Sequence, residues 1–359
     1  MNKTLALTGG GTMGHISPNL ALLSEFKKHF SKIIYIGSKD SMEEKKAKEF
    51  GLPFFAVPVI KFDRKNLLRN LKIPCTLKRA RKQVVEILKN NKVDVVFSKG
   101  GFVSVPVMLG ATQAGVPYVL HESDMTLGLA NKLGSRHAKQ IFVATEKAKT
   151  SLPKKYQSKT VVTGIPVKDD FQKSSPTPFM QNIKNKTNKK IMVVTGGSQG
   201  SKKLNEVIRS CLPFLTAKFH VIHITGKGNL DPTIQNKNYE QIEFTDHMPD
   251  YMKLSNVVVS RGGATTIFEG LKSEANMIVV PLEKSKHSRG DQVENAKYFS
   301  SLDLIEWTQE ENLDKDKLMS LIDSIEKNKT TRLKNIKNFN SSIMKNAKIA
   351  EFVSKIAKK

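Results

Sequence analysis

Two glycine-rich turns in this chain have the residue types that bind phosphate groups. They cover residues 9–15 (GGGTMGH) and 196–201 (GGSQGS), and each directly follows a short apolar run. A segment with a helical pattern comes after each turn, at 18–30 and at 202–210. Because glycine lets backbone amides approach a ligand and a helix N-terminus presents free N–H groups, we expect both turns to bind anions. Two such turns, far apart in one chain, predict two nucleotide-type domains that face each other across a cleft.

The first turn also has the G-x-G-x-x-G spacing of dinucleotide-binding folds, at Gly9, Gly11 and Gly14. Such folds normally place an acidic residue at the end of the second strand to bind a ribose. Here only the displaced Asp40 is available, so a tight turn without a ligand is the alternative. His15, at the start of the following helix, is a candidate general base, although a histidine at a helix start commonly serves as a cap.

The second turn differs from the loops that hydrolyse nucleoside triphosphates. Ser198 and Gln199 offer a hydroxyl and an amide for phosphate contacts. Lys202 and Lys203 follow Ser201, however, so the Lys-Ser/Thr ending of a P-loop is missing. The sequence therefore disfavours ATP hydrolysis at this turn.

Two further strand ends lead into small residues. Residues 260–269 (SRGGATTIFE) join a strand-like run to a helix, and Glu269 falls about one turn into that helix, where a carboxylate can bind a ribose diol or complement the helix dipole. Residues 100–104 (GGFVS) follow the strand-like run 93–97. Together these turns favour a ligand that has both a diphosphate and sugar hydroxyls.

Strand-like and helix-like segments alternate through both halves of the chain, which predicts an α/β fold with mainly parallel sheets. A length of 359 residues predicts two domains. The segment 164–166 and the polar stretch 173–190 are typical of a connection, so we place the domain boundary there. The expected strands are 5–8, 32–36, 93–97, 117–120, 140–144, 160–162, 191–195, 219–224, 256–260 and 277–280, and the other expected helices are 43–50, 77–90, one from 265 and a charged helical segment from 313.

The formal net charge of +26 predicts attraction to phosphates, nucleic acid and anionic lipid surfaces. Residues 61–82 interleave basic and apolar side chains, a pattern typical of shallow contact with an anionic membrane or of a solvated helix face. No apolar run is long enough to span a membrane, and the first residues do not resemble a signal peptide. Neither the two cysteines nor Asp314-Lys315-Asp316 predicts a metal site, and the chain is expected to be cytosolic.

Several of these segments together resemble the peptidoglycan N-acetylglucosaminyltransferases, which are GT-B glycosyltransferases of family 28. The similar blocks occur in the same order, at 10–18, 100–106, 121–132, 164–168, 196–205, 244–248, 261–269 and 291–296. The resemblance implies two Rossmann-like, doubly wound domains with an interdomain cleft. Residues 1–163 would form an N-terminal acceptor and membrane domain, and residues 164–339 a C-terminal UDP-GlcNAc-binding domain. A C-terminal helix at about 340–359 would pack back on the first domain.

By this resemblance the chain would be an inverting hexosyltransferase that needs no metal and no other cofactor. It would move N-acetylglucosamine (GlcNAc) from UDP-GlcNAc to the 4-hydroxyl of MurNAc-(pentapeptide)-pyrophosphoryl-undecaprenol. This step converts lipid I to lipid II in peptidoglycan synthesis. The expected location is the cytoplasmic face of the cell membrane, as a peripheral protein without a transmembrane helix. An anionic membrane surface is therefore an expected partner, and nucleic acid is not.

The resemblance also implies roles for individual residues, with the donor bound mainly by the second domain. His15 matches the family's motif histidine and is the candidate catalytic base. Glu269 would bind the ribose, the backbone near Thr245 the uracil, and Gln292 the sugar. The expected donor-binding residues are Thr12, Met13, Gly14, Asp124, Lys168, Ser198, Gln199, Thr245, Ala264, Thr265, Thr266, Glu269, Asp291 and Gln292. The expected acceptor-binding residues are Gly100, Gly101, Val103, Ser104 and Asn131. Relatives commonly have other residues at Met13 (Gly), Asp124 (Asn), Lys168 (Arg) and Asp291 (Gln).

Three other functions compete with this reading. Another GT-B transferase could glycosylate a lipid or small molecule with a different nucleotide sugar. An NAD(P)-dependent oxidoreductase would use the first glycine turn, but it leaves Ser198 and Glu269 without a role. A nucleic-acid-binding protein fits the charge, but no recognised module and few aromatic residues support it.

Overall fold

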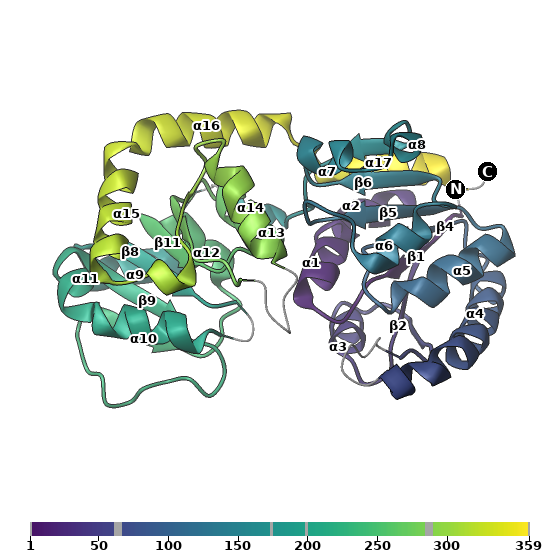
Figure 1. Cartoon of the computed structure of the whole chain (residues 1–359), viewed down its shortest axis with the longest axis horizontal. Coiled ribbons are helices and arrows are strands. Elements are labelled where there is room, and N and C mark those ends of the chain that lie inside the picture. Colours follow the sequence, from purple (N-terminus) through teal and green to yellow (C-terminus); the bar gives the residue numbers. More distant parts are fainter. Residues whose placement is uncertain (1, 61–66, 173–174, 198–199, 284–289, 358–359) are drawn as a thin grey trace. The chain divides into compact units, whose positions relative to one another are not determined.

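The computed structural model describes residues 2–60, 67–172, 175–197, 200–283 and 290–357. The chain divides into two compact units (Figure 1). Unit 1 contains Met1–Lys168 together with Ile343–Lys359, and unit 2 contains Asp169–Ser342. Each unit is built around one parallel sheet of its own.

The sheet of unit 1 has the order β3-β2-β1-β4-β5-β6-β7, and every neighbouring pair is parallel. The strand order reverses between β1 and β4, so the segments that follow these two strands lie side by side at the carboxyl edge of the sheet. The strands are β1 (Thr4–Thr8), β2 (Lys32–Gly37), β3 (Phe54–Ala56), β4 (Val95–Ser98), β5 (Tyr118–Glu122), β6 (Gln140–Val143) and β7 (Thr160–Val162).

Helices cover both faces of this sheet, and each face has its own apolar core. The C-terminal helix α17 (Asn346–Ile356), yellow in Figure 1, packs on this unit, because Ile349 and Val353 belong to the same core cluster as Leu5 and Phe26. The other helical elements are α1 (Met13–Ala21), α2 (Leu23–His29), α3 (Met42–Glu49), η1 (Leu67–Lys72), α4 (Ile73–Asn90), α5 (Ser104–Ala114), α6 (Leu129–Gly134), α7 (Glu146–Thr150) and α8 (Lys154–Gln157).

Unit 2 repeats the scheme with the order β10-β9-β8-β11-β12-β13, again all parallel. Here the order reverses between β8 and β11. The strands are β8 (Lys190–Thr195), β9 (Phe219–Ile224), β10 (Tyr239–Ile242), β11 (Val257–Ser260), β12 (Met277–Val279) and β13 (Glu306–Trp307). The helical elements are η2 (Asp169–Phe171), α9 (Pro178–Lys186), α10 (Lys202–Ser210), α11 (Leu212–Lys218), α12 (Met248–Leu254), α13 (Ala264–Lys272), α14 (Asp291–Ser300), η3 (Glu310–Asn312), α15 (Lys315–Lys327) and α16 (Lys329–Ser342).

Two local expectations differ from the structure. The helix expected at 18–30 begins at Met13, contains Pro18 within α1, and is split at Leu22 into α1 and α2. The polar stretch expected to be a connection contains α9, in which Thr177 caps the amide of Met180 and proline occupies the first turn. Proline and threonine at that point therefore start a helix and do not only mark a linker.

Candidate active site

The first glycine turn joins β1 to α1 and is held by groups of the protein itself. The Tyr35 hydroxyl donates to the carbonyl oxygen of Gly9 over 2.5 Å, and the Gly11 amide donates to the Glu43 carboxylate over 3.3 Å. Glu43 is only 1% exposed, and a β-carbon on Gly10 would lie 2.5 Å from its carboxyl group. A dinucleotide diphosphate at this turn would therefore meet a buried carboxylate. This arrangement counts against the oxidoreductase alternative.

His15 lies in the first turn of α1 and is partly exposed. Its Nδ1 is 3.0 Å from the hydroxyl oxygen of Thr12, the residue at the N-cap position of this helix. When Nδ1 carries the proton, it donates to Thr12, and Nε2 then has the lone pair that a general base needs. Thr12 can therefore orient the imidazole for proton transfer.

The turn after β4 touches the first turn. Gly100 and Gly101 have φ angles of 86° and 83°, in the left-handed region that favours glycine. A β-carbon on Gly101 would lie 2.5 Å from the carbonyl oxygen of Gly10, so the two turns approach as backbone against backbone. Ser104, the first residue of α5, donates its hydroxyl to the carbonyl of Gly100, and Val103 is buried. The structure therefore brings two of the predicted turns together.

A buried carboxylate, Glu122, holds the loop that follows β5. It is 4% exposed and accepts hydrogen bonds from the amides of Ser123, Asp124 and Gly128 at 2.8–3.1 Å. The predicted acceptor residue Asn131 is also buried, and its Nδ2 donates to Glu122 over 3.0 Å. Glu122 therefore sets the position of the loop that carries Asp124.

Next to this carboxylate lies a lysine that the sequence-based predictions did not include. Lys99 is 1% exposed, and its Nζ is 2.5 Å from His121 Nδ1 and 2.7 Å from Ser123 Oγ. The other ring nitrogen of His121 is 2.9 Å from the carbonyl oxygen of Gly164, which fixes the tautomer with the proton on Nε2. Burial lowers the pKa of Lys99 to about 7, while the charges of Glu122 and Asp124 oppose that decrease. Burial, with Lys99 as a second cause, lowers the pKa of His121 well below its usual value.

In unit 2, the second glycine turn joins β8 to α10 and packs closely on its neighbours. Gly200 has a φ of 70°, and a β-carbon there would lie 2.3 Å from the carbonyl oxygen of Thr225. Ser201 caps α10 by accepting from the amide of Leu204, and it also accepts from the Arg261 guanidinium. The predicted phosphate ligands Ser198 and Gln199 lie outside the described residues.

The start of α13 is a helix N-terminus that belongs to the predicted donor set. Gly263 precedes the helix, and no described side chain caps it. Of the described atoms, a β-carbon on Gly263 would meet just the Thr266 hydroxyl within 4 Å, at 3.8 Å. The first-turn amides of Ala264, Thr265 and Thr266 therefore have no capping side chain among the described residues, and such amides can bind an anion. Glu269 lies in the same helix and is partly exposed.

The predicted sugar-binding residue Gln292 also connects three segments of unit 2 through hydrogen bonds. Its Oε1 accepts from the amides of Gly262 and Leu282 at 3.1 and 2.9 Å, so it joins the start of α14 to the segments after β11 and β12. Asn295 supports the same contact, because its Nδ2 donates to the Gly262 carbonyl over 3.1 Å. Of the Gln292 amide, the Nε2 group is the donor that a sugar hydroxyl would use. Asp291 is the first residue of α14.

Most predicted residues that the structure describes therefore lie at the carboxyl ends of parallel strands, as expected for ligand sites in this type of sheet. In unit 1 they follow β1, β4 and β5. In unit 2 they follow β10, β11 and β12, and the Thr245 hydroxyl accepts from the amide of His247 over 2.9 Å. Lys168 does not follow a strand directly. It is the last residue of the first segment of unit 1, and its Nζ lies 5.3 Å from the centre of the Phe50 ring.

Three residues that support these sites were missed from the sequence, namely Glu43, Lys99 and Glu122. Each is charged and almost fully buried. Lys99 and Glu122 each lie two residues after an expected apolar strand, 93–97 and 117–120, and Glu43 lies in the first turn of α3. A charged residue at the carboxyl end of such a run is the signal that could have identified the two strand-end residues.

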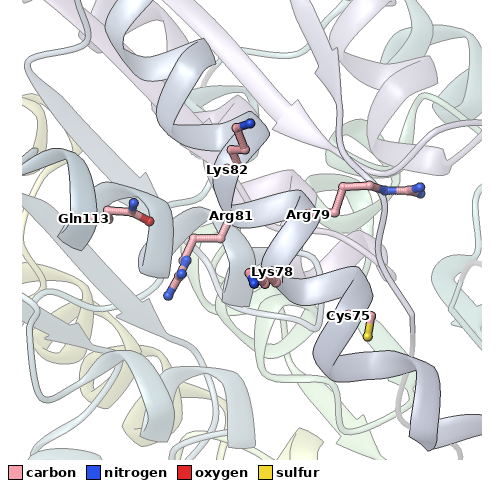
Figure 2. A pocket seen from close by; sticks show the side chains of 6 residues that line it. All are labelled: Cys75, Lys78, Arg79, Arg81, Lys82 and Gln113. Atoms are coloured by element: carbon pink, nitrogen blue, oxygen red, sulfur yellow. The ribbon is translucent and has the colours of Figure 1, made fainter.

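A basic surface lies apart from these turns, on α4. Figure 2 shows Lys78, Arg79, Arg81 and Lys82 along this helix, with Gln113 of α5 beside it; together with Cys75 they line a pocket. Leu71, at the end of η1, is 73% exposed. Residues 61–66 of the predicted basic stretch lie outside the described residues. Among the described helices none is long and apolar enough to cross a bilayer, and the described residues contain no cluster of His, Cys, Asp and Glu suited to a metal.

Comparison with known proteins identifies matches along most of the chain. Residues 5–143 match the glycosyltransferase family 28 N-terminal domain, and residues 191–353 match the family 28 C-terminal domain. A Bacillus cereus protein named UDP-N-acetylglucosamine--N-acetylmuramyl-(pentapeptide) pyrophosphoryl-undecaprenol N-acetylglucosamine transferase 2 is 37% identical over 340 residues, covering 94% of this chain and 96% of the relative. The Clostridium tetani protein named as the same transferase, without the number 2, is 38% identical over 340 residues, with 94% of both chains covered.

Two solved structures have the same architecture. Acinetobacter baumannii MurG superposes with a TM-score of 0.74 at 21% identity, covering 98% of this chain and 99% of that one. The glycotransferase of kitacinnamycin superposes with a TM-score of 0.75 at 15% identity, covering 99% and 100%. At these identities the superpositions support the fold alone. The predicted two-domain GT-B α/β fold is confirmed.

Proposed function

Because the chain belongs to glycosyltransferase family 28, we propose that it transfers GlcNAc from UDP-GlcNAc to the 4-hydroxyl of undecaprenyl-pyrophosphoryl-MurNAc-pentapeptide. The product is lipid II, and the reaction is a step of peptidoglycan synthesis. Curated relatives named for this reaction match 94% of the chain at 37–38% identity. The structural observation that supports it best is the N-terminus of α13, which has no capping side chain in the part of the chain that the structure describes, with Glu269 in the same helix. Amides for a diphosphate and a carboxylate for a ribose diol are what a nucleotide sugar requires.

The two halves of the chain would bind different substrates. Residues 164–339 would form the donor-binding domain, and residues 1–163, with the helical segment at about 340–359, the acceptor and membrane domain. In the donor domain, the amides of Ala264–Thr266, with Ser198 and Gln199, would bind the diphosphate. Glu269 would accept from the ribose hydroxyls, the backbone near Thr245 would bind uracil, and Asp291 and Gln292 would bind the sugar.

Residues of unit 1 would complete the reaction. Thr12, Met13, Gly14 and Asp124 would approach the donor sugar, and Lys168 the phosphates. The acceptor diphosphate would bind at the turn that contains Gly100, Gly101, Val103 and Ser104. Asn131 would act there by supporting Gly100, since a β-carbon on Gly100 would lie 2.9 Å from its Nδ2.

The chemistry is an inverting displacement at the anomeric carbon. His15 Nε2 would take the proton of the acceptor 4-hydroxyl as its oxygen attacks that carbon, with Thr12 fixing the imidazole through Nδ1. The bond between the anomeric carbon and the diphosphate oxygen breaks, and UDP leaves. Amides at the start of α13 would stabilise the negative charge that develops on UDP.

We also propose that the protein acts as a peripheral protein at the cytoplasmic face of the membrane, where α4 contacts anionic lipid. The support is the presence of four cationic side chains on α4, Lys78, Arg79, Arg81 and Lys82, together with the exposed Leu71. Co-sedimentation with vesicles is expected to require anionic lipid and to weaken as salt rises. Equal binding to neutral vesicles would contradict the electrostatic part.

The decisive experiment incubates the protein with labelled UDP-GlcNAc and lipid I and measures labelled lipid II. A His15→Ala variant should bind UDP-GlcNAc normally and lose most turnover, because the donor's nucleotide is bound by the other domain. Near-normal turnover would remove His15 from the chemistry. Competition between UDP-GlcNAc and UDP-glucose separates this function from that of a GT-B enzyme that uses a different nucleotide sugar.

A further inference from the structure

A buried lysine lies among the turns of unit 1 in a place where few proteins tolerate a charge. Lys99 is 1% exposed and directly precedes the glycine pair of the proposed acceptor turn. Its side-chain stem packs on the first glycine turn, because a β-carbon on Gly9 would lie 2.9 Å from both Lys99 Cβ and the carbonyl oxygen of His15. Lys99 is therefore in contact with the segment that carries the proposed base.

The amino group of Lys99 extends toward the loop after β5. It is hydrogen-bonded to Ser123 Oγ at 2.7 Å, and Ser123 is followed directly by Asp124. The amino group is also 2.5 Å from Nδ1 of His121, a residue of β5. The other ring nitrogen of the neutral His121 donates to the Gly164 carbonyl. The charged groups that act on Lys99 are Glu122 and Asp124, both of which favour its protonated form.

Burying an ammonium group without opposite charge nearby is strongly unfavourable, so its retention calls for a compensating role. Glu122 is already bound by three backbone amides and one side-chain amide, which satisfy much of its own charge. Asp124, which the proposed function assigns to the donor sugar, is a second carboxylate whose charge favours the protonated form of Lys99. A positive charge behind the loop offsets this negative charge.

We propose that Lys99 is a positioning residue for the transfer reaction: its buried amino group, bound to Ser123 and His121, holds the loop that carries Asp124 in place and supplies a positive charge opposite to that of Asp124. The inference rests on the proposed function, because Asp124 is assigned to the donor sugar there. Lys99 touches neither substrate in this proposal. It acts through Asp124 and Ser123, and through its contact with the turn before His15. The charges of Lys99 and Asp124 therefore depend on each other. Removing one of these charges should reduce turnover by more than is expected when both are removed together.

A double-mutant cycle tests this coupling. Lys99→Met, Asp124→Asn and the double variant are compared with the unaltered chain in the lipid II assay. We expect each single variant to lose at least tenfold in turnover. The double variant should retain at least tenfold more turnover than the product of the two single effects predicts, equivalent to about 1.4 kcal/mol of coupling. Effects that multiply would overturn the proposal.

The same variants give a readout that needs no substrate. Unfolding in urea should show coupling between Lys99 and Asp124 at pH 6, where the ammonium is charged, and little coupling at pH 9. Lys27→Met on α2, an exposed lysine, is the matched control and should combine with Asp124→Asn without coupling. If the unaltered chain makes no lipid II, the proposed function fails whatever the unfolding data show. Coupling in unfolding without coupling in turnover would assign Lys99 to stability alone and overturn its positioning role.

Discussion

Lowering the pH should destabilise unit 2 through one buried histidine. His223, on β9, is fully buried between α10 and β10. Its Nδ1 is 2.9 Å from the Tyr239 hydroxyl and its Nε2 is 3.0 Å from Asn205 Oδ1. The neutral ring, with its proton on Nε2, satisfies both contacts, and Asn205 in turn donates to the Thr225 carbonyl beside the second glycine turn. Burial, with Arg209 as a second cause, lowers the pKa of His223 to about 3.

The size of the effect follows from proton linkage. The native histidine has its pKa below that of the unfolded chain, so its contribution to stability is present above pH 6.5 and decreases as the pH falls from 6.5 toward 3. At pH 5 the unfolded chain gains about 2 kcal/mol by protonating a histidine with an ordinary pKa, and the native state gains almost nothing. The limiting slope is about 1.36 kcal/mol for each pH unit.

The assay is urea unfolding followed by the fluorescence of Trp307. This residue is the single tryptophan of the chain and lies on β13, so its signal reports on unit 2. The free energy of unfolding is measured between pH 8 and pH 5 for the unaltered chain and for His223→Gln, whose side chain does not titrate. We expect the difference between the two chains to shrink by about 2 kcal/mol over this range.

Taking this difference removes the contributions of other titrating groups, including His220, whose pKa burial also lowers. The exposed His137 provides a matched control, and His137→Gln should leave the pH profile of the Trp307 transition unchanged. Parallel profiles for His223→Gln and the unaltered chain would refute the reasoning. They would mean that His223 is protonated equally in the native and unfolded states.

Three further predictions concern the glycine turns and the donor site. Glu269→Gln should weaken UDP binding in calorimetry by about 10–100-fold, since a hydrogen bond to a charged group contributes about 1.5–3 kcal/mol; unchanged affinity would remove Glu269 from ribose binding. Gly101→Ala should destabilise unit 1 by more than about 1 kcal/mol, because its φ is 83° and the new β-carbon would lie 2.5 Å from the Gly10 carbonyl. UDP binding should remain, and a loss of it would contradict the assignment of this turn to the acceptor. Gly262→Ala should lower the free energy of unfolding detected by Trp307 fluorescence by about 1–3 kcal/mol, because the new β-carbon would lie 2.8 Å from the Gln292 carbonyl oxygen. An unchanged transition would show that α14 can move away without cost.

The architecture could be predicted because its signals are local. The segments expected as strands at 191–195 and 256–260 contain the buried strands β8 and β11, and the alternation of strands with helices favours parallel sheets. Family membership followed from motifs in a fixed order, and the comparisons confirm it. The roles of the predicted site residues remain predictions.

The sequence by itself determined where the backbone could approach a phosphate, since glycine spacing and helix starts are written in consecutive residues. Only the tertiary structure decided which amides are occupied. The Gly11 amide binds Glu43, whereas the start of α13 has no capping side chain among the described residues. The partners of Lys99 were equally hidden, because they depend on strand order and on which distant segments meet at one edge of the sheet. The role of a buried charged residue depends on partners that are distant in the sequence, so a local sequence pattern cannot predict it.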